Sequence, residues 1–79
     1  MKIQILGKGC PNCELLAQRA REAVAELGLD AQVEKITDVD KILDMGVMMT
    51  PALAIDGDVK RVGKVLAKSQ IIEILKGGN

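Results

Sequence analysis

Two cysteines, Cys10 and Cys13, are the residues of this chain whose type and spacing could do chemistry. They are the only cysteines among 79 residues, and they occur in the sequence Cys10-Pro11-Asn12-Cys13. Two thiols at this spacing are compatible with thiol–disulfide exchange and with the binding of a soft metal ion. The chain has no histidine, so neither an imidazole base nor an imidazole metal ligand is available.

The residues around the pair predict that it lies at the start of a helix. Residues 2–6 read as a buried strand, residues 7–9 as a turn, and Pro11 suits the first position of a helix. Cys10 would then be the N-cap residue, and Cys13 would close the first turn. Because the N-terminus of a helix favours a thiolate, we expect the pKa of Cys10 to lie below the ordinary thiol value of about 8.5.

The two sulfurs are predicted to be inequivalent. A helix over residues 11–27 would end at Gly28. Counting back three residues from Leu16, the first member of its apolar stripe, reaches Cys13. Cys13 should therefore face the core, while Cys10 lies at the exposed helix end. The expected stripe consists of Leu16, Ala20, Val24 and Leu27.

The middle of the chain predicts a second strand and a short helix. Residues 31–36 read as the strand. The helix would begin at Thr37, with a hydroxyl cap and acidic residues in its first turn, and end at Gly46. Its expected apolar face consists of Val39, Ile42 and Leu43.

The last third of the chain predicts a hairpin followed by a helix. Residues 51–55 read as a strand that opens with a proline, and Asp56-Gly57 is a strong hairpin turn sequence. Residues 58–62 would return as an antiparallel strand. Residues 68–76 are predicted to be helical because the hairpin needs a cover on one sheet face.

These elements predict an α/β fold in one domain over residues 1–79, with the order β-α-β-α-β-β-α. Right-handed crossovers give a four-stranded mixed sheet flanked by helices. The first and third strands are the most apolar and should be central, so the strand order is 2-1-3-4.

The composition excludes some partners. The chain is 48% hydrophobic, carries no aromatic residue and has zero net charge. It therefore lacks stacking platforms and a basic cluster, which argues against nucleic acid and against an anionic membrane as partners. The apolar run near Met1 is too short for a signal peptide or a membrane span, so we expect a cytoplasmic protein.

The whole chain resembles the thioredoxin and glutaredoxin superfamily, and it looks closest to the small thioredoxin-like redox-active disulfide proteins. The residues that carry the resemblance are the Gly-x-Gly-Cys-x-x-Cys sequence of residues 7–13, Thr50-Pro51, Asp56-Gly57 and Gly63. Two features differ: Gly9 stands where thioredoxin has an aromatic residue, and no acidic residue matches thioredoxin's buried one.

The resemblance implies a thiol–disulfide oxidoreductase that uses a redox-active disulfide between Cys10 and Cys13 and no organic cofactor. Cys10 would attack and Cys13 would resolve. Thr50 and a cis Pro51 would shape the substrate groove, and Gly63 would let the chain pass close to the site. The implied partners are protein disulfides and a separate reductase, with the protein acting as a monomer.

Two other interpretations remain open. The same cysteines are compatible with a soft-metal binding or transfer module, with copper(I) favoured over zinc because one chain offers only two thiols. Met48-Met49 could add thioether ligands, although methionines more often fill irregular space or form adaptable contact surfaces. The third interpretation is an interaction domain without catalysis.

Overall fold

The computed structural model describes residues 1–8 and 11–77. Their elements, in chain order, are β1 (Lys2–Leu6), α1 (Pro11–Leu27), β2 (Gln32–Ile36), α2 (Val39–Asp44), β3 (Ala52–Ile55), β4 (Asp58–Val62) and α3 (Lys68–Leu75). This is the predicted order. Two strands begin one residue late: β2 excludes Ala31, and β3 begins after Pro51, which has no N–H to contribute to a strand ladder.

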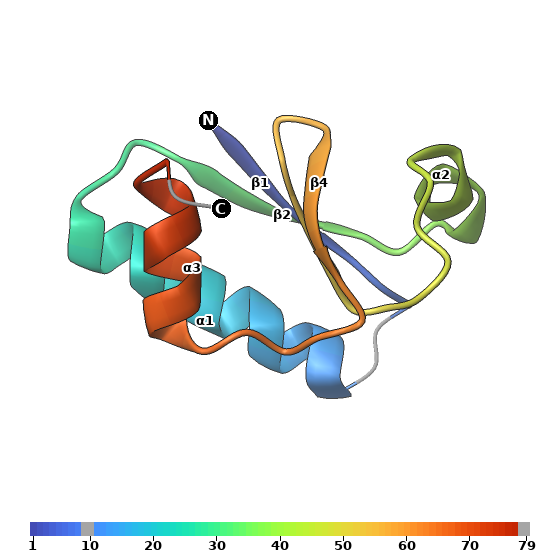
Figure 1. The fold of residues 1–79 in the computed structure, drawn as a ribbon, viewed down its shortest axis with the longest axis horizontal. Coiled ribbons are helices and arrows are strands. Elements are labelled where there is room, and N and C mark those ends of the chain that lie inside the picture. Colours follow the sequence, from blue (N-terminus) through green and yellow to red (C-terminus); the bar gives the residue numbers. More distant parts are fainter. Residues whose placement is uncertain (9–10, 78–79) are drawn as a thin grey trace.

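The four strands form one mixed sheet in the order β2-β1-β3-β4, as predicted (Figure 1). β1 pairs with β2 in parallel and with β3 in antiparallel, and β4 pairs with β3 in antiparallel. The central position of β1 follows from its side chains, because Ile3, Ile5 and Leu6 are all buried. The parallel β1–β2 pair requires a crossover, and α1 provides it.

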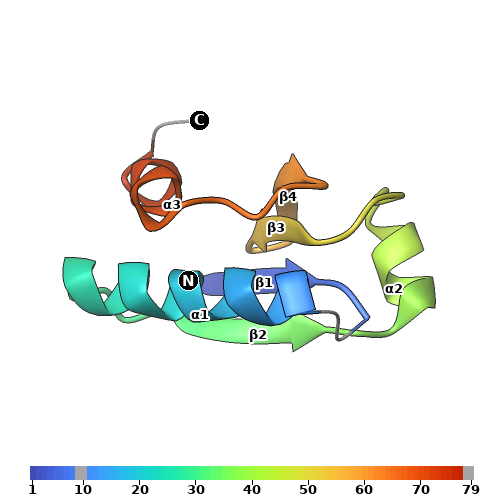
Figure 2. The same ribbon diagram turned by 90° about the horizontal axis from the view of Figure 1, so that it is seen from below.

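The helices cover the two faces of the sheet unequally. α1 and α3 pack together on one face, against Ile3 and Ile5 of β1 and Leu53 of β3. α2 lies at the other side of the molecule, where Ile42 joins a second, smaller core cluster that includes Leu6 (Figures 1 and 2). Because side chains alternate along a strand, β1 supplies both clusters. No helix among residues 1–8 and 11–77 has the length and apolarity needed to cross a membrane.

The buried face of α1 is rotated relative to the predicted stripe. Leu16 and Ala20 are buried as expected, but Val24 and Leu27 are only partly buried. Ala17 and Ala23 are buried in their place. The small alanine side chains allow α1 to approach the sheet closely, so the helix turns its alanines inward and leaves the larger residues at the border.

The predictions for α2 were partly wrong. The N-cap residue is Asp38, whose side chain accepts a hydrogen bond from the Asp40 N–H, and not Thr37. Of the predicted apolar face, only Ile42 is buried, while Val39 and Leu43 are exposed. A helix of six residues at the edge of the sheet can bury one side chain against Leu6 and Ile36, and it has no second layer to cover the others.

The hairpin of β3 and β4 contains an irregularity that the sequence did not predict. Asp56 and Gly57 form the turn with φ angles of 51° and 85°, which explains the Asp-Gly sequence. Leu53 pairs with Arg61, but the next residue, Ala54, pairs with Val59. Lys60 is therefore the extra residue of a β-bulge, which increases the local twist of the hairpin.

Candidate active site

Cys13 lies in the first turn of α1, which begins at Pro11 as predicted. Its side chain is only 2% exposed, and the residue is disulfide-bonded. The prediction that Cys13 faces the core is confirmed. The predictions that Cys10 is the N-cap residue and is exposed fall outside the described residues.

Gly7, the residue directly after β1, packs against the Cys13 side chain. Gly7 is buried, and its N–H donates a hydrogen bond to the Ile36 oxygen at 2.9 Å. A Cβ atom at Gly7 would overlap the Cys13 Sγ and would lie 3.2 Å from the Cys13 Cβ. The same point is 3.7 Å from the Thr50 Cβ. The carboxyl end of β1, the start of α1 and the segment before β3 therefore meet around Gly7.

Thr50 and Pro51 lie beside this meeting point. Thr50 is exposed, Pro51 is buried, and the peptide bond between them is cis, as the resemblance implies. The Gly63 N–H donates a hydrogen bond to the Pro51 oxygen at 2.8 Å. A Cβ at Gly63, whose φ is 73°, would lie 3.3 Å from the Met49 Cε. Gly63 therefore lets the end of β4 lie close to the segment before Pro51.

The charges near the start of α1 are on the surface. The Lys35 Nζ lies 2.7 Å and 2.9 Å from the two carboxylate oxygens of Glu14, which links the first turn of α1 to β2. The hydrogen bond and the charge of Lys35 lower the pKa of Glu14 below its ordinary 4.5. Within the described part of the chain no polar or charged side chain is buried, so no carboxylate there lies beside Cys13 in the core.

Two exposed methionines directly precede Thr50. Met48 is 88% exposed and Met49 is 64% exposed, and neither belongs to a core cluster. This supports an adaptable contact surface as the role of the two methionines. Across residues 1–8 and 11–77, no three His, Cys, Asp or Glu side chains gather in a way that could hold a metal ion.

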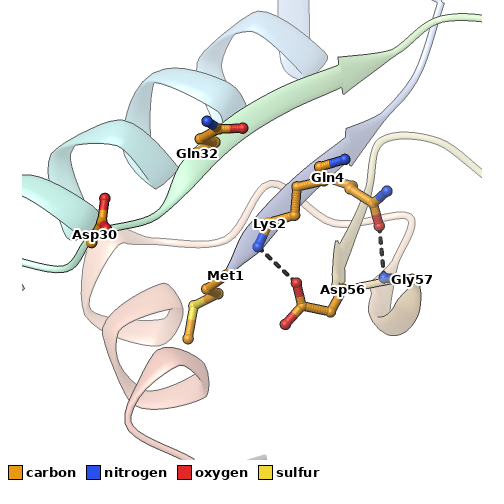
Figure 3. Close-up of a pocket in the computed structure, with 7 residues that line it drawn as sticks. All are labelled: Met1, Lys2, Gln4, Asp30, Gln32, Asp56 and Gly57. Atoms are coloured by element: carbon orange, nitrogen blue, oxygen red, sulfur yellow. Dashed lines mark hydrogen bonds between the residues drawn. The ribbon is translucent and has the colours of Figure 1, made fainter.

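A polar cavity of about 660 Å³ lies at the other end of β1 (Figure 3). Its lining includes Lys2 and Gln4, and both residues make hydrogen bonds to the β3–β4 turn. Gly7 and Cys13 are at the opposite end of the strand. This cavity therefore lies away from Cys13 and is not part of the candidate active site.

Gly7 was predicted to be part of a turn, and its contact with the Cys13 sulfur was not predicted. The position of Gly7, between a buried strand and the Cys-x-x-Cys pair, was the one feature of the sequence that pointed to this contact. The element that brings Thr50 to the same place is distant in sequence, so the packing itself could not be read from the pattern.

Comparison with known proteins agrees with this geometry. The family model described as "Thioredoxin domain" matches residues 1–76. The chain belongs to the thioredoxin family. It is 53% identical to a thioredoxin from Methanothermobacter thermautotrophicus over 75 residues, which cover 95% of this chain and 97% of that protein. It is 40% identical to a thioredoxin from Methanocaldococcus jannaschii over 74 residues, covering 94% and 85% of the two chains.

Family membership establishes the class of chemistry. Like other thioredoxins, the protein is a thiol–disulfide oxidoreductase that works through a redox-active disulfide and needs no organic cofactor. The four-stranded sheet with three helices is the thioredoxin fold that the sequence predicted. The comparisons give no support to the soft-metal interpretation of the two cysteines.

Proposed function

We propose that this protein reduces disulfides in other proteins, with Cys10 as the attacking thiol and Cys13 as the resolving thiol. The observation that carries the proposal is the 2% exposure of Cys13. A sulfur this deeply buried is out of reach of a disulfide on another protein. The first attack therefore falls to the other cysteine of the chain, Cys10.

The proposed cycle has two exchange steps. The Cys10 thiolate attacks one sulfur of the substrate disulfide, forms a mixed disulfide and releases the other substrate sulfur as a thiolate. The Cys13 thiolate then attacks the Cys10 sulfur of the mixed disulfide and releases the second substrate thiolate. Both leaving thiolates take up protons, so the substrate gains two electrons and two protons, and the protein is left with a Cys10–Cys13 disulfide.

We assign the substrate groove to Thr50 and Pro51. Thr50 is exposed and Pro51 is buried behind it, at the point where the chain also approaches Cys13 through Gly7. The exposed Met48 and Met49 precede this pair and offer an adaptable apolar surface to a substrate chain. Together they would hold the polypeptide on either side of the substrate disulfide.

The proposal includes the setting of the reaction. We place the protein in the cytoplasm, as a monomer with one domain over residues 1–79, where a separate reductase would return Cys10 and Cys13 to the dithiol form. Neither nucleic acid nor a membrane takes part. In a reducing compartment, a disulfide of this kind persists only as a step of a cycle.

The test uses insulin as the disulfide substrate and dithiothreitol as the source of electrons. We expect Cys10→Ser to lose activity by about a thousandfold or more, because the attacking group is removed. Cys13→Ser should accumulate a mixed disulfide with the substrate, visible by mass spectrometry, because the resolving thiol is missing. The opposite pattern, in which Cys10→Ser traps the substrate, would contradict the assignment of roles.

The matched control is Met48→Ser, which changes an exposed side chain outside the cysteine pair. Alone, Met48→Ser should alter KM for a protein substrate by severalfold. Combined with Cys13→Ser, it should leave the final yield of mixed disulfide unaffected. A second measurement is the pH dependence of Cys10 alkylation in the reduced protein. We expect a midpoint below the ordinary thiol value of about 8.5. A midpoint at that value would remove the proposed activation by the helix terminus.

A further inference from the structure

We propose that Gly7 is a positioning residue for the thiol–disulfide reaction, because its missing side chain makes the room that the Cys13 sulfur occupies in the oxidised protein. The inference rests on the proposed function, since that function gives the Cys13 sulfur its part in the reaction. It adds a residue outside the Cys-x-x-Cys sequence that sets the balance between disulfide and dithiol.

The packing around Gly7 leaves no space for a methyl group. A Cβ there would overlap the Cys13 Sγ and lie 3.2 Å from the Cys13 Cβ. Optimal contacts between carbon atoms are about 3.5 to 4.0 Å, so both contacts are too short. The same Cβ atom would lie 3.7 Å from the Thr50 Cβ, which is an ordinary van der Waals contact. The conflict therefore falls on the sulfur and leaves the proposed substrate groove undisturbed.

Hydrogen bonds hold the backbone on the amino side of Gly7 in place, which limits how far it can move to relieve this conflict. The Gly7 N–H is bonded to the Ile36 oxygen, and the preceding residue, Leu6, pairs with both neighbouring strands. The φ angle of Gly7 is not positive, so Gly7 does not use the left-handed backbone region that favours glycine. Glycine is required at this position because of the neighbouring side chain and not because of the main chain.

The two redox states respond differently to an added methyl group. In the oxidised protein, the disulfide bond holds the Cys13 side chain in one rotamer, so its sulfur cannot turn away. In the reduced protein, the thiol can choose between the two rotamers that a helix allows. A side chain at Gly7 should therefore disfavour the disulfide more than the dithiol, which makes the couple more oxidising.

The first test measures the equilibrium of Gly7→Ala with a glutathione buffer. One oxidised glutathione and one protein dithiol exchange to give two reduced glutathiones and one protein disulfide. The oxidised fraction is read by alkylation and mass spectrometry. We expect the equilibrium constant for disulfide formation to fall about tenfold, the effect of moderate overpacking. A value within twofold of the unsubstituted protein would overturn the proposal.

Gly28→Ala is the matched control. It is the same substitution just beyond the other end of α1, where φ is 64° and a Cβ would meet no atom within 4 Å. Gly28→Ala should lower the free energy of unfolding because alanine fits poorly at a positive φ, and this loss should be equal in the two redox states. Its glutathione equilibrium should therefore stay within twofold of the unsubstituted protein. An equal shift in both variants would show a general loss of stability and would overturn the proposal.

A second measurement separates the sulfur from the rest of the fold. Gly7→Ala should lower the urea midpoint of the oxidised protein more than it does in a Cys13→Ala background, where the sulfur is absent. If Gly7→Ala alone fails to fold, folding of the double variant would support the proposal, and failure of the double variant would overturn it. Neither measurement uses a substrate, so an inactive protein in the insulin assay would contradict the proposed function alone.

Discussion

The two ends of β1 have different surroundings. At the carboxyl end, Leu6 and Gly7 are buried, and Gly7 lies directly against the Cys13 side chain. At the amino end, the Lys2 N–H donates a hydrogen bond of 2.7 Å to the Asp56 carboxylate, and Gln4 accepts one of 2.9 Å from the Gly57 N–H, beside an open polar cavity (Figure 3). One end is fixed by close packing and the other by hydrogen bonds exposed to water.

This difference explains where reactivity can be tuned. A closely packed environment acts on a neighbouring group through volume, so we expect one methyl group added at Gly7 to displace the Cys13 sulfur. Hydrogen bonds that compete with water contribute little net free energy and tolerate substitution. The side chains that line the cavity at the amino end include no thiol.

Leu6→Ala should lower the free energy of unfolding by about 2 to 5 kcal/mol, because Leu6 is fully buried in the smaller core cluster. Urea unfolding monitored by circular dichroism measures the change. The control at the other end of the same strand is Lys2→Ala, an exposed residue that should cost less than about 0.5 kcal/mol. Similar losses of unfolding free energy in Leu6→Ala and Lys2→Ala would contradict the view that close packing fixes only the carboxyl end of β1.

Asp56→Ala should lower the free energy of unfolding by about 1 to 2 kcal/mol. Alanine removes the acceptor for the Lys2 N–H and fits poorly at a φ of 51°. Asp56→Asn keeps an acceptor and tolerates this φ, so its loss should be less than half as large. Insulin reduction by both variants should match the unsubstituted protein at a temperature where they are folded. A tenfold loss of activity would show that the amino end takes part in the reaction.

Gln4→Ala should cost about 0.5 to 1 kcal/mol, the net contribution of one hydrogen bond to the Gly57 N–H. Gln4→Glu keeps an acceptor at that place and should cost less. Chemical denaturation of the two variants side by side gives the difference. A loss above about 2 kcal/mol for Gln4→Ala would mean that the amino end depends on packing as the carboxyl end does.

The ion pair between Glu14 and Lys35 should give a small pH effect. Because Lys35 lowers the pKa of Glu14 below 4.5, the folded state gains stability from this pair above the unfolded pKa. That gain is lost as the pH falls through the lowered folded pKa. Carboxyl NMR titration should show the low pKa of Glu14 and its return towards 4.5 in Lys35→Met. An unchanged titration in Lys35→Met would rule out the ion pair as the cause.

Much of the fold could be predicted from local patterns. Pro11 and Gly28 marked the limits of α1, Asp56-Gly57 marked the hairpin, and the apolar β1 and β3 were placed at the centre of the sheet. The burial of Cys13 followed from its spacing to Leu16. Each of these features depends on a residue and its near neighbours in sequence, or on how apolar a strand is. Both can be read from a single sequence.

Other features depend on the tertiary structure, and local sequence patterns did not predict them correctly. The exposure of Val39 and Leu43 follows from the small area that α2 covers at the sheet edge. The bulge at Lys60 follows from the pairing of β3 with β4. The cis bond before Pro51 was expected only through the resemblance, because no local pattern fixes the isomer of a proline bond.

The amino-acid sequence alone supplied the reactive groups of this protein, namely two thiols at a fixed spacing, no imidazole, and a proline that suits the first turn of a helix. The tertiary structure alone decided how the Cys13 sulfur is surrounded. Gly7, which packs against that sulfur, and Thr50 are more than forty positions apart in sequence, and they become neighbours only when β1 and β3 pair. Packing is a property of volumes in contact, and a pattern along the chain does not contain it.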